Sequence, residues 1–116
     1  NGPYDVNSFA VTAALAALDD KSYIDNYVSE VKKARALIER KFASTTIRKH
    51  FGGGNYFLIW PNKNPKLLTR QMREKGILIR EMKNKKDIED SIRVSIGTRE
   101  QMSFFWSIYK ELDLSN

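Results

Sequence analysis

A chain of 116 residues is long enough for one domain with a modest hydrophobic core. Hydrophobic residues make up 41% of it and charged residues 29%, which is typical of a globular protein rather than a disordered one. The lack of cysteine excludes disulfides and cysteine-ligated metals, and with a single histidine we expect no metal site. The net charge of +6 is compatible with an anionic partner but does not identify one.

The apolar runs of the sequence are short. The longest, Ala13–Leu18 and Tyr56–Trp60, fall far below the length of a membrane span. The first residues, Asn1 to Asp5, do not resemble a signal peptide. We therefore expect a cytoplasmic protein without a membrane partner, and a chain cut from a longer one.

The amino-terminal part of the chain predicts two helices. Asn7 or Ser8 can cap a first helix over residues 9–18, which is apolar nearly all round and should pack against protein outside this domain. From about Ser22 to Phe42, apolar residues recur at steps of three and four. This spacing predicts one long amphipathic helix.

The middle of the chain predicts two strands and a helix. The β-branched residues at positions 45–47 favour a short strand, and the three glycines at 52–54 a flexible loop. The apolar segment Asn55–Trp60 then predicts a strand, which Pro61 ends. Asn64 before a proline is typical of a helix start, and that helix should end at Gly76.

The last part of the chain predicts two strands and a helix. Ile77–Arg80 should form a short strand, followed by a basic loop at 82–86. Ser91–Ile96 alternates apolar and polar residues, as a strand with one buried face does. Thr98 and Gln101 have the spacing of a capping box at the start of the final helix.

These elements predict an α/β protein of the two-layer α+β kind. We expect a small, mostly antiparallel sheet of about four short strands, covered on one face by amphipathic helices and preceded by a long helix. Ile92, Val94 and Ile96 should face the helices. Arg93 should then point from the uncovered face.

Two arginines are candidate binding residues. Arg80 and Arg93 lie in or at the end of apolar strands, where an unpaired guanidinium is costly to bury. A guanidinium presents a planar fork of donors that suits carboxylate or phosphate. A solvated strand face or an internal salt bridge remains the alternative interpretation.

Other conspicuous residues have simpler interpretations. No phosphate-loop lysine follows the three glycines, and His50 has no candidate catalytic partner at a meaningful spacing. Tyr56, Phe57 and Trp60 could stack on nucleic-acid bases, but at strand spacing we expect them in the core.

Five motifs occur in a fixed order along the chain. They are Pro3-Tyr4-Asp5-Val6-Asn7-Ser8, the Ala-rich segment ending Ala-Ala-Leu-Asp-Asp at residue 20, Gly54-Asn55-Tyr56-Phe57-Leu58, Gly76-Ile77-Leu78-Ile79-Arg80 and Ile92-Arg93-Val94-Ser95-Ile96-Gly97-Thr98. The ordered set resembles the carboxy-terminal small domain of class I/II (fold type I) pyridoxal-phosphate-dependent aminotransferases. Within that family it is most similar to the histidinol-phosphate aminotransferases.

The resemblance implies roles for three substrate-binding residues. Arg93 matches the family's late arginine, which binds the substrate carboxylate, and Arg80 matches an arginine that helps to hold a substrate phosphate. Asn55 matches the family's asparagine before an aromatic residue, although Tyr56 intervenes here before Phe57. Residues 1–18 correspond to a segment between domains and near the dimer interface, and residues 19–116 to the small domain. A homodimer and a large domain of the same parent chain are the implied partners.

The resemblance also implies which parts of the chemistry lie elsewhere. Pyridoxal 5'-phosphate is the family's cofactor, and none of the lysines here sits in the family's Schiff-base motif. We therefore expect no catalytic and no cofactor-binding residue in this chain, which should be inactive alone. The parent enzyme is expected to transfer an amino group between an amino-acid-like, possibly phosphorylated, substrate and a 2-oxo acid.

Two alternatives remain. A related enzyme on the same scaffold would decarboxylate a phosphorylated amino acid, and its phosphate would suit the same arginines. A basic nucleic-acid-binding module is the alternative from another class. The sequence lacks the Arg/Lys-Gly-Phe pattern of an RNA-recognition strand and a concentrated basic stripe, so we expect no nucleic-acid partner.

Overall fold

The computed structural model describes residues 21–83 and 85–115. Its helices are α2 (Lys21–Ala43), α3 (Pro65–Glu74) and α4 (Arg99–Tyr109), and α4 continues into the π-helical turn η1 (Lys110–Leu114). The strands are β1 (Arg48–Phe51), β2 (Tyr56–Trp60), β3 (Arg80–Glu81) and β4 (Ile92–Ser95).

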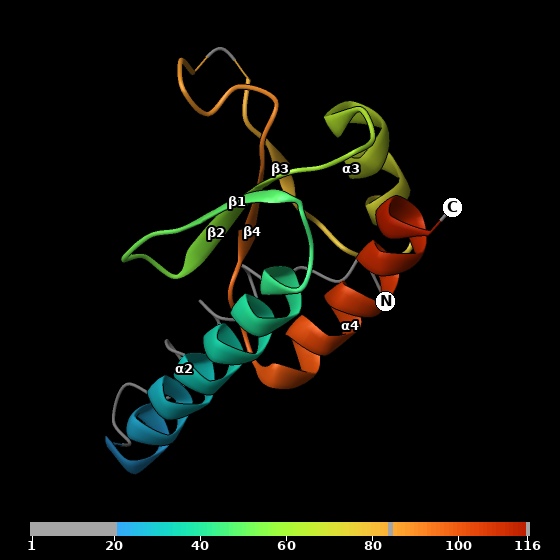
Figure 1. Ribbon diagram of the computed structural model, residues 1–116. Helices are drawn as coiled ribbons and strands as arrows, with labels where there is room; N and C mark the ends of the chain where they lie inside the picture. The colour runs from blue at the N-terminus through green and yellow to red at the C-terminus, as the bar shows by residue number, and fades with distance from the viewer. Residues whose placement is uncertain (1–20, 84, 116) are drawn as a thin grey trace.

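The strands form one antiparallel sheet in the order β1-β2-β4-β3, and the helices lie on one side of it (Figure 1). The α+β fold expected from the sequence is confirmed. The helix expected at 9–18 lies outside the described residues.

The long helix α2 buries one stripe of its surface. Ala34, Ile38 and Phe42 are fully buried, and their spacing of four residues places them on one helix face. This face packs against α4, which lies beside α2 beneath the sheet (Figure 1). The helix expected from Ser22 to Phe42 is therefore confirmed, with one further residue at each end.

The first strand begins three residues later than the sequence suggested. The Thr45 hydroxyl donates to the Phe42 carbonyl at 2.7 Å and accepts from the Ile47 amide at 3.2 Å. These local bonds close a turn after α2, so the β-branched residues at 45–47 end the helix and β1 starts at Arg48.

The third strand is also shorter than the predicted Ile77–Arg80, because Ile77 takes part in the cap that ends α3. Gly76 has φ 88° and donates to the Arg73 carbonyl, and Ile77 donates to the Met72 carbonyl, both at 2.9 Å. This pair of bonds is a Schellman cap. Only Arg80 and Glu81 pair with β4, although the predicted ending of the helix at Gly76 is confirmed.

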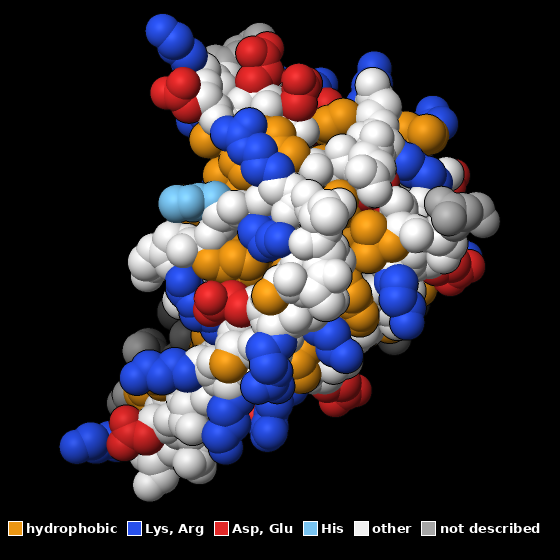
Figure 2. Space-filling model, in the orientation of Figure 1, with side chains coloured by type: hydrophobic (Ala, Val, Ile, Leu, Met, Phe, Trp, Pro, Cys, Tyr) orange, Lys and Arg blue, Asp and Glu red, His pale blue; other side chains and the backbone are white. Residues whose placement is uncertain are grey.

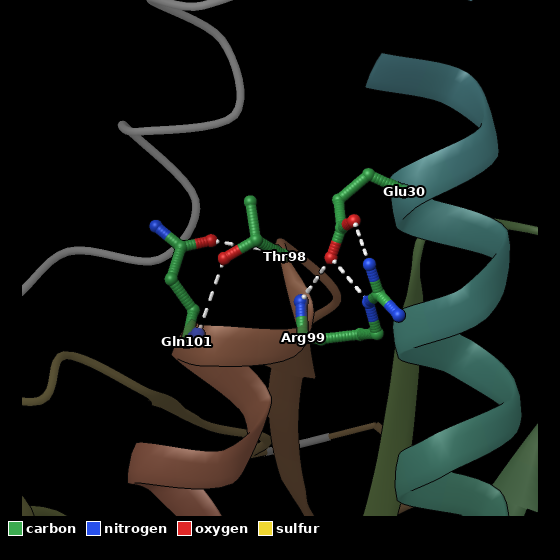
Figure 3. A network of polar contacts seen from close by, with 4 residues as sticks. All are labelled: Glu30, Thr98, Arg99 and Gln101. Carbon is green, nitrogen blue, oxygen red and sulfur yellow. Dashed lines mark hydrogen bonds and ion pairs between the residues drawn. The ribbon is translucent and has the colours of Figure 1, made fainter. Parts of the chain in front are cut away.

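Both predicted helix caps are confirmed. The Asn64 side chain accepts from the amides of Lys66 and Leu67 at the start of α3. At α4, the Thr98 hydroxyl accepts from the Gln101 amide at 3.1 Å, and the Gln101 side chain accepts from the Thr98 amide at 2.8 Å. This capping box starts α4 directly after β4, as Figure 3 shows.

The core lies between the sheet and the helices. Ile92, Val94 and Ile96 are 2% exposed or less, so their predicted burial is confirmed. Phe57 is also buried, whereas Tyr56 is 37% exposed and Trp60 is half-buried. The expectation that all three aromatic residues of this strand belong to the core was therefore right only for Phe57. The strand alternates, and Tyr56 and Trp60 lie on its other face.

Candidate anion-binding face

One row of paired residues crosses the whole sheet on the face away from the helices. His50 on β1 pairs with Leu58 on β2, Leu58 pairs with Arg93 on β4, and Arg93 pairs with Arg80 on β3. Residues directly opposite each other in an antiparallel sheet project from the same face. The row therefore brings Arg80 and Arg93 together as neighbours on one face. We call this face, which includes the residues two positions along each strand from the row, the open face.

The two arginines carry like charges at opposite positions, with Cβ atoms expected about 5 Å apart. Among the described residues, ion pairs join Arg35 to Glu39, Lys83 to Glu81 and Arg99 to Glu30. No ion pair within this part of the chain involves Arg80 or Arg93. Glu81, next to Arg80, lies on the opposite face because it pairs with the buried Ile92. Within residues 21–83 and 85–115, therefore, no internal salt bridge holds these arginines.

The Arg93 guanidinium is stacked on an aromatic ring. Its Cζ atom lies 4.4 Å from the centre of the Tyr56 ring. Tyr56 pairs with Ser95, so Tyr56 and Arg93 are diagonal neighbours on adjacent strands. Stacking occupies one face of the guanidinium plane, whereas its N–H donors point outward within the plane. Arg93 can therefore be held by Tyr56 and still bind an anion at its edge.

The β1 end of the open face is partly covered by the loop between β3 and β4. The Trp60 indole donates to the Glu89 carbonyl at 3.1 Å, and the Arg48 guanidinium lies 4.0 Å from the Trp60 ring centre. A hollow of about 270 Å³ separates Arg48, His50 and Leu58 from Ile88 of this loop. Leu58, which lines this hollow, is 6% exposed.

A second hollow lies on α3, apart from the arginine pair. It measures about 560 Å³ and is lined by Lys66, Arg70, Arg73, Lys83 and Glu81, among others. Lys83 is paired with Glu81 at 3.3 Å. Lys66, Arg70 and Arg73 lie on α3 and Lys83 follows β3, so none of these cations belongs to the row that contains Arg80 and Arg93.

The start of α4 is fixed to α2 by Glu30. The Glu30 carboxylate accepts from the Arg99 backbone amide at 2.8 Å and from the Arg99 guanidinium at 2.9 Å through each oxygen (Figure 3). These hydrogen bonds lower the pKa of Glu30 below its ordinary value. Since α4 begins four residues after β4 ends, the contact also fixes the end of the strand that carries Arg93.

Asn55 lies at the edge of the sheet, just before β2. Its backbone carbonyl accepts from the Ile96 amide at 2.8 Å. The alternation of β2 places Tyr56 on the open face, so Asn55 does not share the row of Arg80 and Arg93. The structure thus brings the two predicted arginines together, and places the predicted asparagine one residue before the ring that stacks on Arg93.

Tyr56 is the residue of this site that the sequence interpretation missed. It was assigned to the core with its neighbours, although residues 56, 58 and 60 alternate with the buried pair Phe57 and Ile59. The alternation with a period of two that predicts the faces of β4 also places Tyr56 on the face of Arg93 when it is extended to β2.

Basic side chains are spread over several elements of the molecular surface seen in Figure 2, and acidic side chains lie among them. A nucleic-acid-binding surface is expected to gather Lys and Arg along one stripe or patch. The arrangement on this face does not favour that alternative.

The described residues do not fit pyridoxal phosphate. Of their lysines, only Lys49 lies on a strand, and it pairs with the buried Ile59 on the helix-covered face. The Lys49 ammonium donates to the Thr45 carbonyl. The strands of the open face thus offer guanidinium groups but no lysine from the described part of the chain.

The described residues lack two other kinds of feature, a metal-binding cluster and a membrane-spanning helix. These residues contain no group of three or more His, Cys, Asp or Glu placed to hold a metal ion. Their helices include none long and apolar enough to cross a membrane.

Comparison with known proteins supports the likeness suggested by the motifs. The chain is 31% identical over 110 residues to histidinol-phosphate aminotransferase 1 of Nostoc sp., covering 94% of this chain and 31% of the relative. It is 36% identical over 108 residues to a dihydroxyacetone phosphate transaminase of Campylobacter jejuni, covering 88% of this chain and 28% of that protein. No protein-family model matches the sequence.

The fold is shared with a solved structure. The histidinol-phosphate aminotransferase of Clostridium acetobutylicum superposes with a TM-score of 0.70 at 23% identity, over 86% of this chain and 31% of that one. The chain therefore spans about three-tenths of the length of the relatives that it matches. The resemblance to histidinol-phosphate aminotransferases is confirmed over most of the chain.

Proposed function

We propose that this chain is the carboxy-terminal, substrate-clamping small domain of a pyridoxal-phosphate-dependent aminotransferase. The enzyme would transfer an amino group between an amino-acid-like, phosphorylated substrate and a 2-oxo acid. The observation that carries the proposal is the pair Arg80 and Arg93, opposite each other on the open face without a carboxylate partner among the described residues. The sequence likeness to two transaminases whose names contain a phosphorylated substrate supports it.

In this proposal Arg93 binds the substrate carboxylate, or the phosphate in the other half-reaction, and Arg80 assists with phosphate. Two adjacent guanidinium groups can offer charge-assisted hydrogen bonds to several oxygens of one anion. Fixing the anion orients the rest of the substrate, which lowers the entropic cost of reaching the reactive geometry. Asn55, at the edge of the same sheet, is proposed as a third substrate-binding residue.

Pyridoxal phosphate would supply the electron sink for the reaction, and it would be held by the large domain of the same parent chain. The described residues bind and orient substrate, and none is proposed as catalytic. We propose further that the parent enzyme is a cytoplasmic homodimer, and that residues 1–18 lie between domains near the dimer interface while residues 19–116 form the small domain. The isolated chain should not transaminate.

The test is an assay of the purified full-length protein loaded with pyridoxal phosphate. With histidinol phosphate as amino donor and 2-oxoglutarate as acceptor, we expect the ketone phosphate formed from the donor and glutamate in equal amounts. Carbon dioxide and an amine formed from a phosphorylated amino acid without any acceptor would instead show a decarboxylase. The absence of both reactions, with salt-sensitive binding to RNA, would favour a nucleic-acid-binding module.

A further inference from the structure

We propose that Tyr56 and Gly54 are positioning residues that hold the Arg93 guanidinium in one orientation, and that Arg35 fixes the loop that carries them. The inference rests on the proposed function, in which Arg93 binds the substrate anion. It assigns a task to three residues that do not themselves touch the anion.

First, the contact between Tyr56 and Arg93 restricts the orientation of the guanidinium. An arginine side chain has many rotamers, and ordering a flexible side chain on binding costs about 0.5–1.5 kcal/mol. The ring of Tyr56 lies under the guanidinium at 4.4 Å and restricts it before any anion arrives. Because the ring occupies the face of the guanidinium, the edge that donates hydrogen bonds remains available.

The second step is the room that Gly54 leaves for the ring. A Cβ atom at Gly54 would lie 3.0 Å from Cε1 and 3.2 Å from Cδ1 of Tyr56, so any side chain there must displace the ring. A Cβ atom at Gly53 would meet nothing within 4 Å. Neither glycine has a φ in the left-handed region, so the difference between the two positions is contact with Tyr56 and not backbone conformation.

The third step is the anchor of the loop. Arg35 on α2 donates through Nη1 to the Gly54 carbonyl at 3.1 Å, and through Nη2 to the Gly52 carbonyl. Its Nε donates to Glu39 at 3.0 Å, one helical turn later. The same guanidinium thus binds the loop at two carbonyls and ties it to the long helix. Without this anchor, a three-glycine loop would be a flexible connection between β1 and β2.

The experiment measures the dissociation constant of inorganic phosphate for the cofactor-loaded full-length protein by calorimetry. We expect Tyr56→Leu and Gly54→Ala to weaken binding by about two- to fivefold, the equivalent of an exposed cation–π contact. Tyr56→Phe keeps the ring and should bind like the wild type, as should Gly53→Ala. Arg35→Gln should weaken binding in the same direction, whereas Arg40→Gln, an exposed position on the same helix, should not.

Arg93→Ala distinguishes a failure of the proposed function from a failure of the positioning inference alone. If Arg93→Ala leaves phosphate binding unchanged, the proposed role of Arg93 fails, and the positioning inference fails with it. If Arg93→Ala weakens binding while Tyr56→Leu and Gly54→Ala match the wild type, only the positioning inference is overturned. An equal loss in Tyr56→Phe and Tyr56→Leu would also overturn it, because the hydroxyl and not the ring would then be responsible. Should Tyr56→Leu fail to fold, Gly54→Ala moves the same ring with the tyrosine retained.

Discussion

Arg80 and Arg93 occupy opposite positions that cost the sheet free energy when no anion is present. Like charges directly across a strand pair are destabilising, and no described carboxylate offsets them. Two other described arginines have polar partners: Arg35 donates to two carbonyls and a carboxylate, and Arg99 donates to Glu30. This contrast is the residue-scale reason to regard the pair as a binding site.

Replacing Arg93 should therefore affect the reaction of the full enzyme strongly. We expect Arg93→Ala to lower kcat/KM by roughly 2 to 4 kcal/mol equivalent, or about 30- to 1000-fold, since charge-assisted hydrogen bonds to the substrate are lost. Arg93→Lys should recover only part of the loss, because an ammonium lacks the planar fork. Steady-state kinetics with a phosphorylated amino donor provide the measurement.

Arg48 offers a matched control for that variant. It lies on the same open face but is stacked on Trp60 at the other end of the sheet. Arg48→Ala should leave kcat/KM within about twofold of the wild type, as for a surface change away from the site. Near-wild-type kinetics for Arg93→Ala, or an equal loss for Arg48→Ala, would contradict the assignment.

At the scale of elements, the connection between β4 and α4 fixes the geometry of the open face. The strand ends at Ser95 and the helix begins at Arg99, so any displacement of α4 moves the strand that carries Arg93. The capping box holds the first turn of α4 internally, and Glu30 ties that turn to α2 (Figure 3). The long helix thus supports both the Gly52–Gly54 loop and the end of β4.

The Glu30 contact predicts a specific pH dependence of stability. The hydrogen bonds from Arg99 lower the pKa of Glu30 below its ordinary value of 4.5 in the folded state. The carboxylate therefore stabilises the fold fully above pH 4.5, and this contribution is lost as the pH falls through the lowered folded pKa. Urea unfolding should show wild type more stable than Glu30→Gln at pH 7, with the difference shrinking below pH 4.5. Arg99→Gln removes the guanidinium that donates to Glu30. If the free energy of unfolding of this variant kept the same pH dependence as wild type, the Arg99 contact would not be its cause.

At the scale of the whole molecule, a one-sided core leaves the other face of the sheet available for binding. Phe42 of α2 is fully buried, with its ring centre 5.6 Å from that of Phe57, 5.0 Å from that of Trp106 and 5.2 Å from that of Tyr109. It therefore joins α2 to both the sheet and α4. The open face keeps its cations because no described helix packs there (Figure 1).

The position of Phe42 predicts a large effect on stability. Phe42→Ala should reduce the free energy of unfolding by about 3–5 kcal/mol, through lost burial and the cavity left among the other rings. Val28→Ala, a change at a 45% exposed position of the same helix, should cost less than about 0.5 kcal/mol. Denaturant titration measures both, and comparable values for the two variants would show that the core is not centred on Phe42.

The sequence by itself determined those helices and strands whose residue patterns depend only on neighbouring positions. The apolar spacing of α2, the Asn64 and Thr98 caps and the alternation of Ile92, Arg93 and Val94 each depend on neighbours within a few residues. The same locality explains the two misplaced strands. β propensity alone predicts strands at Thr45 and at Ile77. In the structure Thr45 closes the turn after α2, and Ile77 belongs to the Schellman cap that ends α3.

Only the tertiary structure decided which residues meet across the sheet. Strand order and register place Arg80 opposite Arg93, Tyr56 beneath Arg93, and Arg35 against the carbonyls of a loop seventeen to nineteen residues away. Spacing along the chain carries no information about such contacts, because register is set by the pairing of strands that are distant in sequence. The arginines could be nominated from the sequence, whereas their shared face and the ring that holds Arg93 follow from the packing of the sheet on its helices.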